Sequence, residues 1–246
     1  MNNHFVNLFS REYLGRIVLL GKDKSGQNVV VIYAVTGRSS SSQGRRIDHE
    51  GGDFYVKPAG QKSLNKGKES LLVYPALCMR KGIAASNGLH TRDILEPLGR
   101  YQNPAAALIS GLSQWDYEPD PPHFTSRISG VVLSSHRGAL GLIKRASDGN
   151  SMRNYFEFPL RRGTGKMVAT YKGKNQNPLP SFEGEPWEVK VSQPNPEKAA
   201  QEIYEALGPS SGKEDYRVSV VCVYCRDVQS SQYSFSIINR CDRRGE

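Results

Sequence analysis

The sequence has few cysteines and no long hydrophobic run, and these absences narrow the class of protein. Its 246 residues include 4 cysteines. A disulfide-rich secreted scaffold is therefore excluded, and free thiols in a reducing, cytoplasmic compartment are expected. The longest apolar runs, residues 29–35 and 218–223, have the length of a strand and not of a membrane span. The first residues show no basic region followed by an apolar stretch, so no signal peptide is expected.

Motifs for metals, nucleotides and nucleophiles are also missing. The chain contains no GxGxxG, no Walker loop, no HExxH and no Gly-x-Ser-x-Gly elbow. Cys222 and Cys225 have the spacing of metal ligands, but no second pair completes a set of four. Cysteines in an apolar strand are commonly core residues. We therefore expect neither a metal nor a cofactor.

Charge is unbalanced but not concentrated. The chain carries 33 basic and 24 acidic side chains, a net charge of +9. Residues 1–123 hold 15 basic and 11 acidic side chains, and residues 124–246 hold 18 and 13, so the excess is spread evenly. Few aromatic residues lie among the basic ones and no nucleic-acid module is present, so a specific nucleic-acid partner is not expected. A diffuse positive field favours small anions such as a phosphate ester.

Strand-like segments dominate the chain and are joined by short turns. Residues 13–20 and 28–35 predict one hairpin, and residues 71–79 and 82–86 predict another. Asn103 and Asn195 each precede a proline, the arrangement of a helix N-cap followed by proline at the first position. Many hairpins with a few helices indicate an α+β fold of mostly antiparallel sheets. We expect a single domain over residues 1–246.

The stretch of residues 117–132 is the strongest candidate for a site. Its first part is stiff and extended because it contains three prolines, Pro119, Pro121 and Pro122. The same span brings several reactive side chains to the start of a predicted strand, namely Glu118, Asp120, His123, Thr125 and Arg127. Binding and catalytic groups are often held in this way. The alternative is a proline-rich surface loop whose charges are only solvated.

Two further turns are candidates for binding anions or polar ligands. The loop at residues 36–46 is rich in serine and includes Arg38 and Ser39, with Arg45 and Arg46 at its end. Arginine and hydroxyl donors suit a phosphate, although the composition also fits a disordered serine linker. The turn that contains Asn87 leads into a helix predicted over residues 92–98, which Thr91 is expected to cap. Helix starts of this kind bind polar ligands.

Several short motifs follow one another along the chain: Tyr13-Leu-Gly-Arg16-Ile, Tyr33 with Arg38-Ser39, Ser86-Asn-Gly-x-His90-Thr91, and Asp116-Tyr-Glu118-x-Asp120 ending in Arg127-Ile. In order and spacing they resemble the archaeal-type stand-alone IMP cyclohydrolases. Residues 177–186 are similar to the longer bacterial members of that family. The resemblance extends from about residue 13 to residue 186.

The resemblance implies a fold and a reaction. The fold is an αββα four-layer sandwich like that of the N-terminal-nucleophile hydrolases, although the chain begins Met1-Asn2 and is not expected to use their nucleophile. In the reaction, the carboxamide nitrogen of 5-formamidoimidazole-4-carboxamide ribotide attacks the formyl carbon. The ring closes, water leaves and IMP is formed in purine biosynthesis. The implied ligand is thus a purine ribonucleotide, and a homo-oligomer is expected.

Roles in that reaction can be given to particular residues. Glu118 is the first choice, and Asp120 the second, for the carboxylate that takes or steers the carboxamide proton. Tyr74, or the turn formed by Asn87 and Gly88, is expected to donate to the formyl oxygen.

The remaining roles concern the phosphate and the base. Arg38 and Ser39 are expected to bind the phosphate together with Arg45, for which Arg46 is the alternative. The other expected substrate contacts, to the base or to the phosphate, are His90, Thr91, Thr125 and Arg127.

An alternative function follows from departures from the family pattern. Arg92 stands where archaeal members have an acid, the loop that carries Arg38 is longer, and residues 61–69 have no counterpart. The second hypothesis is therefore a relative that binds purine nucleotides, or regulates through them, without cyclohydrolase activity.

Overall fold

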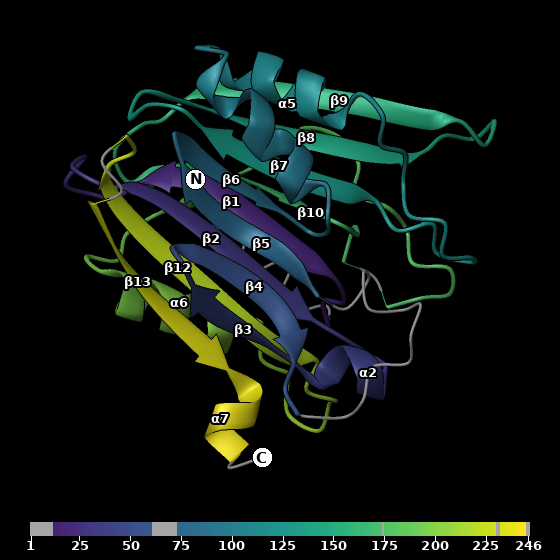
Figure 1. Cartoon of the computed structure of the whole chain (residues 1–246). Helices are drawn as coiled ribbons and strands as arrows, with labels where there is room; N and C mark the ends of the chain where they lie inside the picture. Colours follow the sequence, from purple (N-terminus) through teal and green to yellow (C-terminus); the bar gives the residue numbers. More distant parts are fainter. Residues whose placement is uncertain (1–11, 61–72, 174, 230–231, 245–246) are drawn as a thin grey trace.

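A computed structural model describes residues 12–60, 73–173, 175–229 and 232–244 of the chain (Figure 1). Within these residues, thirteen strands form two sheets, and their ladders are antiparallel. Free cysteines are found at all four positions, each of them buried. Residues 61–69, which have no counterpart in the family pattern, lie outside the described residues.

The six-stranded sheet draws its strands from both halves of the chain. In order across the sheet they are β11 (Trp187–Lys190), β10 (Thr164–Ala169), β1 (Arg16–Lys22), β2 (Val29–Thr36), β12 (Arg217–Asp227) and β13 (Gln232–Asn239). The predicted hairpin of β1 and β2 is confirmed, with Arg16 opposite Val35. Every residue of β2 is buried, which explains its uninterrupted apolar sequence.

The seven-stranded sheet is a meander in which each strand pairs with the next along the chain. Its strands are β3 (Arg45–Glu50), β4 (Asp53–Pro58), β5 (Tyr74–Arg80), β6 (Gly82–Ser86), β7 (Arg127–Val132), β8 (Arg137–Arg145) and β9 (Ser151–Pro159). The second predicted hairpin, between β5 and β6, is also confirmed.

Helices cover the outer face of each sheet. On the seven-stranded sheet lie α4 (Thr91–Leu95), the 3₁₀ turn η1 (Glu96–Gly99) and α5 (Pro104–Leu112), and on the six-stranded sheet lies α6 (Pro196–Ala206). In Figure 1, α5 lies in front of the seven-stranded sheet and α6 lies behind the other. The predicted α+β class with antiparallel sheets is confirmed, in four layers of the αββα order. The kinship with N-terminal-nucleophile hydrolases stays a prediction.

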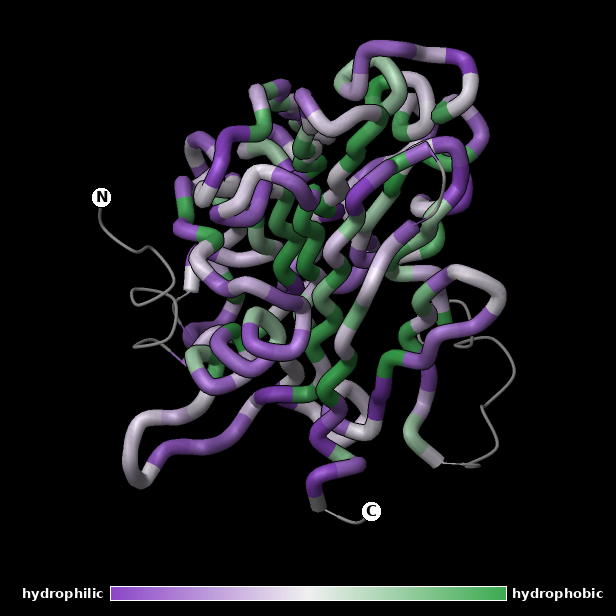
Figure 2. Tube along the Cα trace, turned by 90° about the vertical axis from the view of Figure 1, so that its left-hand side faces the viewer, coloured by the Kyte–Doolittle hydropathy of each residue, from purple (hydrophilic) through white to green (hydrophobic). Residues whose placement is uncertain are grey.

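The two sheets pack closely through their apolar inner faces, which form the green interior of Figure 2. Strands β1 and β7 meet at this interface. A Cβ placed on Gly130 of β7 would lie 2.8 Å from Cγ1 of Val18 and 3.2 Å from Cδ1 of Leu20, both in β1. Glycine at this position therefore allows the sheets to approach.

Local structure departs from the predictions at the serine-rich loop and at the turn that follows β6. The loop contains a short helix, α2 (Ser40–Gln43), whose N-cap is Ser39, and it then enters β3 at Arg45. Thr91 does not cap the next helix. It is the first residue of α4, where His90 is the N-cap and no side chain caps the helix. The hydroxyl of Thr91 instead donates to the Gly88 carbonyl.

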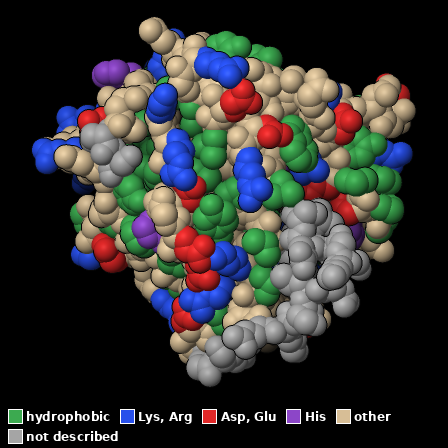
Figure 3. Space-filling model, in the orientation of Figure 1, with side chains coloured by type: hydrophobic (Ala, Val, Ile, Leu, Met, Phe, Trp, Pro, Cys, Tyr) green, Lys and Arg blue, Asp and Glu red, His purple; other side chains and the backbone are tan. Residues whose placement is uncertain are grey.

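The surface carries mixed charge. On the face shown in Figure 3, lysine and arginine side chains are interspersed with aspartate and glutamate. Among the described residues, no helix is both long and apolar enough to cross a membrane.

Candidate active site

A cavity of about 410 Å³ lies at one end of the sandwich, where strands of both sheets begin or finish. The six-stranded sheet contributes Arg16 at the start of β1 and Thr36 at the end of β2. The seven-stranded sheet contributes Arg45 and Tyr74, the first residues of β3 and β5. The other lining residues come from the connecting segments: Leu14, Gly15, Gly37, Arg38, Ser39, Ser42, Asn87, Glu118, Asp120, His123, Thr125, Thr170, Tyr171 and Leu179.

Arg16 is fixed in the cavity by a crowded backbone turn. Gly15 has a φ of +140°, and a Cβ there would lie 2.2 Å from Oγ1 of Thr170. Only glycine fits this position. The backbone N–H of Arg16 donates to the same Thr170 hydroxyl (3.0 Å), and its Nη1 donates to the Thr36 carbonyl (2.9 Å). The side chain is thus held against the end of β2 with its guanidinium in the cavity.

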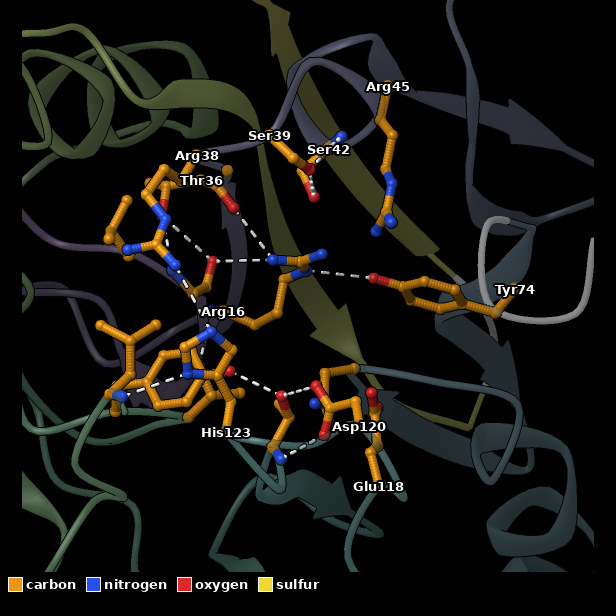
Figure 4. Close-up of a pocket in the computed structure, with 18 residues that line it drawn as sticks. Arg16, Thr36, Arg38, Ser39, Ser42, Arg45, Tyr74, Glu118, Asp120 and His123 are labelled. Carbon is orange, nitrogen blue, oxygen red and sulfur yellow. Dashed lines mark hydrogen bonds between the residues drawn. The ribbon is translucent and has the colours of Figure 1, made fainter. Parts of the chain in front are cut away.

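Three guanidinium groups line the same side of the cavity (Figure 4). They belong to Arg16, Arg38 and Arg45. Arg45 is buried, and its Nε has no hydrogen-bond partner. Burial lowers the pKa of Arg45, and the positive charge of Arg16 lowers it further. Such a cluster is unfavourable without an anion, so this side of the cavity is suited to bind one.

The structure also separates the two adjacent arginines that the sequence left as alternatives. Arg45 lines the cavity. Arg46 instead pairs with Asp48 at 2.7 Å and with Asp242 at 3.1 Å. It is therefore Arg45 that is available to a ligand.

A pair of tyrosines joins the two sheets beside Arg16. The hydroxyls of Tyr33 in β2 and Tyr74 in β5 are 2.8 Å apart, and Nε of Arg16 donates to the Tyr74 oxygen at 3.4 Å. Burial acts to lower the pKa of Arg16, but the two phenol oxygens and Glu118 outweigh it, and the net pKa is raised. The guanidinium therefore stays charged next to the Tyr74 hydroxyl.

The proline-rich loop brings two carboxylates to the other side of the cavity (Figure 4). Asp120 accepts hydrogen bonds from the backbone N–H (2.6 Å) and the hydroxyl (2.5 Å) of Thr125, so both of its oxygens hold the loop. The N–H of Glu118 donates to the Thr125 carbonyl at 2.9 Å. The loop is thereby closed on itself, and the Glu118 carboxylate is left to face the cavity.

Glu118 makes one long ion pair, 3.5 Å from Nη1 of Arg127. Burial raises the pKa of Glu118 and outweighs the lowering by Arg127, so the net pKa is raised above that of an ordinary glutamate. A carboxylate that is partly desolvated and weakly paired is suited to accept a proton.

Four of the predicted site residues do not line the cavity: Gly88, His90, Thr91 and Arg127. Arg127 lies behind Glu118, its Nε donates to the Asp116 carbonyl at 2.7 Å, and its guanidinium stacks on Trp115. His90 is fully buried, with Nδ1 3.4 Å from Nη1 of Arg127 and Nε2 without a partner. Burial, together with the charge of Arg127, lowers the pKa of His90 to about 3.

Asn87 lines the cavity, but its amide has a structural partner on each side. Its Oδ1 accepts from the N–H of Ile128 (2.8 Å), and its Nδ2 donates to the Ser126 carbonyl (3.0 Å). The turn after β6 is thus tied to the start of β7, and one amide hydrogen of Asn87 remains for a ligand.

Sequence reasoning did not select several residues that line the cavity. Arg16 was part of a motif but had no assigned role, although an arginine that directly follows a glycine at a strand start was a usable signal. Thr170 and Tyr171 follow β10 and gave no signal, because a hydroxyl at a strand end is common in any sheet. The hydroxyl of Tyr171 reaches that of Thr125 at 2.6 Å, so it contributes to holding the loop.

The cavity therefore has two chemically different sides. Arginines and hydroxyls on one side can bind a phosphate, and a carboxylate on the other can take a proton from a nearby group. Within the described parts of the chain, no three His, Cys, Asp or Glu side chains come close enough together to hold a metal ion.

Comparison with protein-family profiles finds a match over most of the chain. The profile of a family described as IMP cyclohydrolase-like protein matches residues 13–229. No curated protein matches the chain. The matched residues include every one that lines the cavity.

Proposed function

Because this chain belongs to the IMP cyclohydrolase-like family, we propose that it is an IMP cyclohydrolase, a hydrolase acting on a cyclic amidine. It closes the purine ring of 5-formamidoimidazole-4-carboxamide ribotide and releases water, which yields IMP. The observation that carries this proposal is the layout of the cavity, with guanidinium groups facing a carboxylate of raised pKa. A nucleotide with a phosphate and a carboxamide needs the guanidinium groups for its phosphate and the carboxylate for its carboxamide.

The proposed reaction depends more on positioning the substrate than on strongly acidic, basic or nucleophilic groups. The attacking nitrogen and the formyl carbon belong to the same molecule, so a site that holds the reactive rotamer supplies much of the rate. A cavity of about 410 Å³ is of the size that encloses a small ligand. The two sheets and the closed loop give it walls with little freedom.

Glu118 is the proposed base. Its carboxylate takes the proton that the carboxamide nitrogen loses as it attacks. Asp120 has both oxygens committed to Thr125, so its proposed role is to position the loop that carries Glu118.

Tyr74 is the proposed donor to the formyl oxygen. Its oxygen already accepts from Arg16, so when Tyr33 donates to it as well, the proton of Tyr74 is free to point into the cavity. A phenol bonded to a cation is a stronger donor than an isolated one. Negative charge that develops on the formyl oxygen is thereby stabilised.

The phosphate is proposed to lie against Arg38 and Arg45. Arg38 is exposed at the mouth of the cavity, and among the described residues it pairs with no carboxylate. The hydroxyls of Ser39 and Ser42, 3.0 Å apart, line the same side. These groups are charge-assisted and neutral donors of the kind that phosphate accepts.

The decisive experiment supplies the formylated ribotide to pure protein and follows the appearance of IMP by chromatography. We expect Glu118→Gln to lower kcat roughly 10²–10⁴-fold with little change in KM, because the shape is retained and only the base is lost. Asp120→Asn is the matched control and should be milder. Near-normal turnover in Glu118→Gln with none in Asp120→Asn would reverse the two roles. Wild-type protein that binds IMP but never forms it would support the nucleotide-binding alternative.

A further inference from the structure

His123 lies at the mouth of the cavity, between two segments that are far apart in the sequence. Its Nδ1 is 3.1 Å from the backbone nitrogen of Leu179, in the loop that follows β10. Its Nε2 is 3.4 Å from Nη2 of Arg38, in the loop that precedes α2. Figure 4 shows the imidazole below the guanidinium of Arg38. The ring therefore belongs to the cationic side of the cavity, although it is carried by the loop of Glu118.

The contact with Leu179 determines which nitrogen carries the proton in the neutral ring. A backbone N–H can only donate, so Nδ1 of His123 must be the acceptor in the shorter of the two contacts. A neutral imidazole has one donor and one acceptor, so Nε2 then carries the hydrogen. That hydrogen points at Arg38, whose guanidinium also has only donors.

Two donors thus converge with no acceptor between them. The two carboxylates that line the cavity make their contacts elsewhere, Asp120 with Thr125 and Glu118 with Arg127. An oxygen atom of an anion between Nε2 of His123 and Nη2 of Arg38 would accept from both and remove the mismatch.

We propose that His123 is a phosphate ligand, which shares an oxygen of the substrate's phosphate with Arg38. The identification of the anion as a nucleotide phosphate rests on the proposed function, whereas the convergence of donors does not. The side chain adds a directed donor without adding charge. The N–H of Leu179 keeps that donor aimed at the cavity, so the loop after β10 contributes to phosphate selectivity through its backbone.

Two variants separate the nitrogens of His123. In His123→Asn the side-chain amide coincides with Nδ1, so the contact with Leu179 can persist while the donor toward Arg38 is lost. In His123→Gln the amide reaches the place of Nε2, so the donor is retained. By calorimetry we expect His123→Asn to bind IMP about tenfold more weakly than the wild type and His123→Gln to stay within about threefold. Binding of inosine, which lacks the phosphate, should be unchanged in both.

Arg38→Ala is the positive control, because it removes the other half of the proposed contact and should also weaken IMP binding without affecting inosine. The proposal is wrong if His123→Asn binds IMP like the wild type, or if inosine binding falls as much as IMP binding. Equal weakening in the asparagine and glutamine variants would also contradict it, because the loss would then come from the loop and not from the donor.

Nitrogen NMR of the His123 ring gives a test that does not depend on catalysis. In the free protein Nε2 should be protonated and Nδ1 should not, and inorganic phosphate should shift the Nε2 resonance. A protonated Nδ1, or no response to phosphate, would overturn the proposal. If no IMP forms from the formylated ribotide while Nε2 still responds to phosphate, the proposed reaction fails and the anion site remains.

Discussion

Glu118 and Asp120 are two residues apart on one loop, and their surroundings give them different chemistry. Both carboxylate oxygens of Asp120 accept hydrogen bonds from Thr125, whereas Glu118 has a single long contact with Arg127. Burial raises the pKa of Glu118 more than Arg127 lowers it. The protonated form of Glu118 is therefore favoured to a higher pH than in an exposed glutamate.

This difference predicts a pH profile for the proposed reaction. A base must be deprotonated, so the rate should fall tenfold per pH unit below the pKa of Glu118. We expect the acidic limb of kcat/KM to lie above pH 4.5, the ordinary value, because the pKa is raised. The residual rate of Glu118→Gln should lack this limb. A wild-type limb at or below the ordinary value would argue against Glu118 as the base.

His90 predicts how stability depends on pH. Its pKa is lowered from 6.5 to about 3 in the folded protein, so the unfolded chain binds a proton between these values that the folded protein does not. The stability due to neutral His90 is complete above pH 6.5 and is lost as the pH falls toward 3. The slope for one proton reaches about 1.4 kcal/mol per pH unit.

The measurement for His90 is urea unfolding at several pH values in this window. His90→Gln should flatten the curve of unfolding free energy against pH, whatever its effect at pH 7. His136, which is exposed, provides the control, and His136→Gln should leave the slope unchanged. If the two variants show the same slope as the wild type, burial of a neutral His90 does not govern acid stability.

Residue type marked Glu118 and Arg38 as candidates, with a solvated loop or a serine linker as the alternative, and the resemblance to a known family gave them their roles. It could not tell Arg127 and His90 from ligand-binding residues. Both are polar and lie in distinctive motifs, yet in the structure they stack and pair behind the carboxylate, out of the cavity. Packing between distant elements determines which side chains of a short motif face the cavity. The local sequence therefore does not predict it.

At the scale of elements, prediction succeeded where periodicity and capping agreed. Asn195 is the N-cap of α6 as predicted, with Oδ1 accepting from the N–H of Lys198 at 3.0 Å, and one face of the helix is buried. Strand β3 was missed because Ile47 is its one large apolar residue and charged side chains fill the rest. Edge strands often carry such charges, and they then look like loops.

The cap of α6 can be tested directly. Asn195→Ala should lower the free energy of unfolding by about 1 kcal/mol, within a range of roughly 0.5–2 kcal/mol, because an N–H of the first turn loses its acceptor. The urea midpoint should fall with no change in the slope of the transition. Asn195→Asp keeps the acceptor and should stay near the wild type. An unchanged midpoint in the alanine variant would show that the cap contributes nothing.

The whole molecule is held by the contact between the sheets, and the cavity depends on it because both sheets supply its walls. Gly130 is a point of close approach between β7 and β1, opposite Val18 and Leu20. The hydroxyls of Tyr33 and Tyr74 join the same sheets at the site. A change in the separation of the sheets would therefore alter the position of Tyr74 relative to Arg16.

Gly130→Ala tests this closeness. The added methyl would lie 2.8 Å from Cγ1 of Val18, so overpacking should cost about 1–3 kcal/mol of stability. Val18→Ala removes the atom that clashes. The double variant should lose less stability than the sum of the losses in the two single variants, by a coupling of about 0.5–3 kcal/mol. Strict additivity would mean that the sheets separate easily at this point.

The topology also predicts the order in which the two sheets can form as the chain leaves the ribosome. The seven-stranded meander is one continuous piece of chain, from β3 to β9, and each strand meets its partner soon after it emerges. The six-stranded sheet cannot close in this way, because β12 lies between β2 and β13 and is synthesised long after β2. Strand β10, the other neighbour of β1, also follows the meander in sequence. We expect β1 and β2 to wait with both edges unpaired while the meander forms, an interval in which a nascent chain is exposed to aggregation and to chaperones.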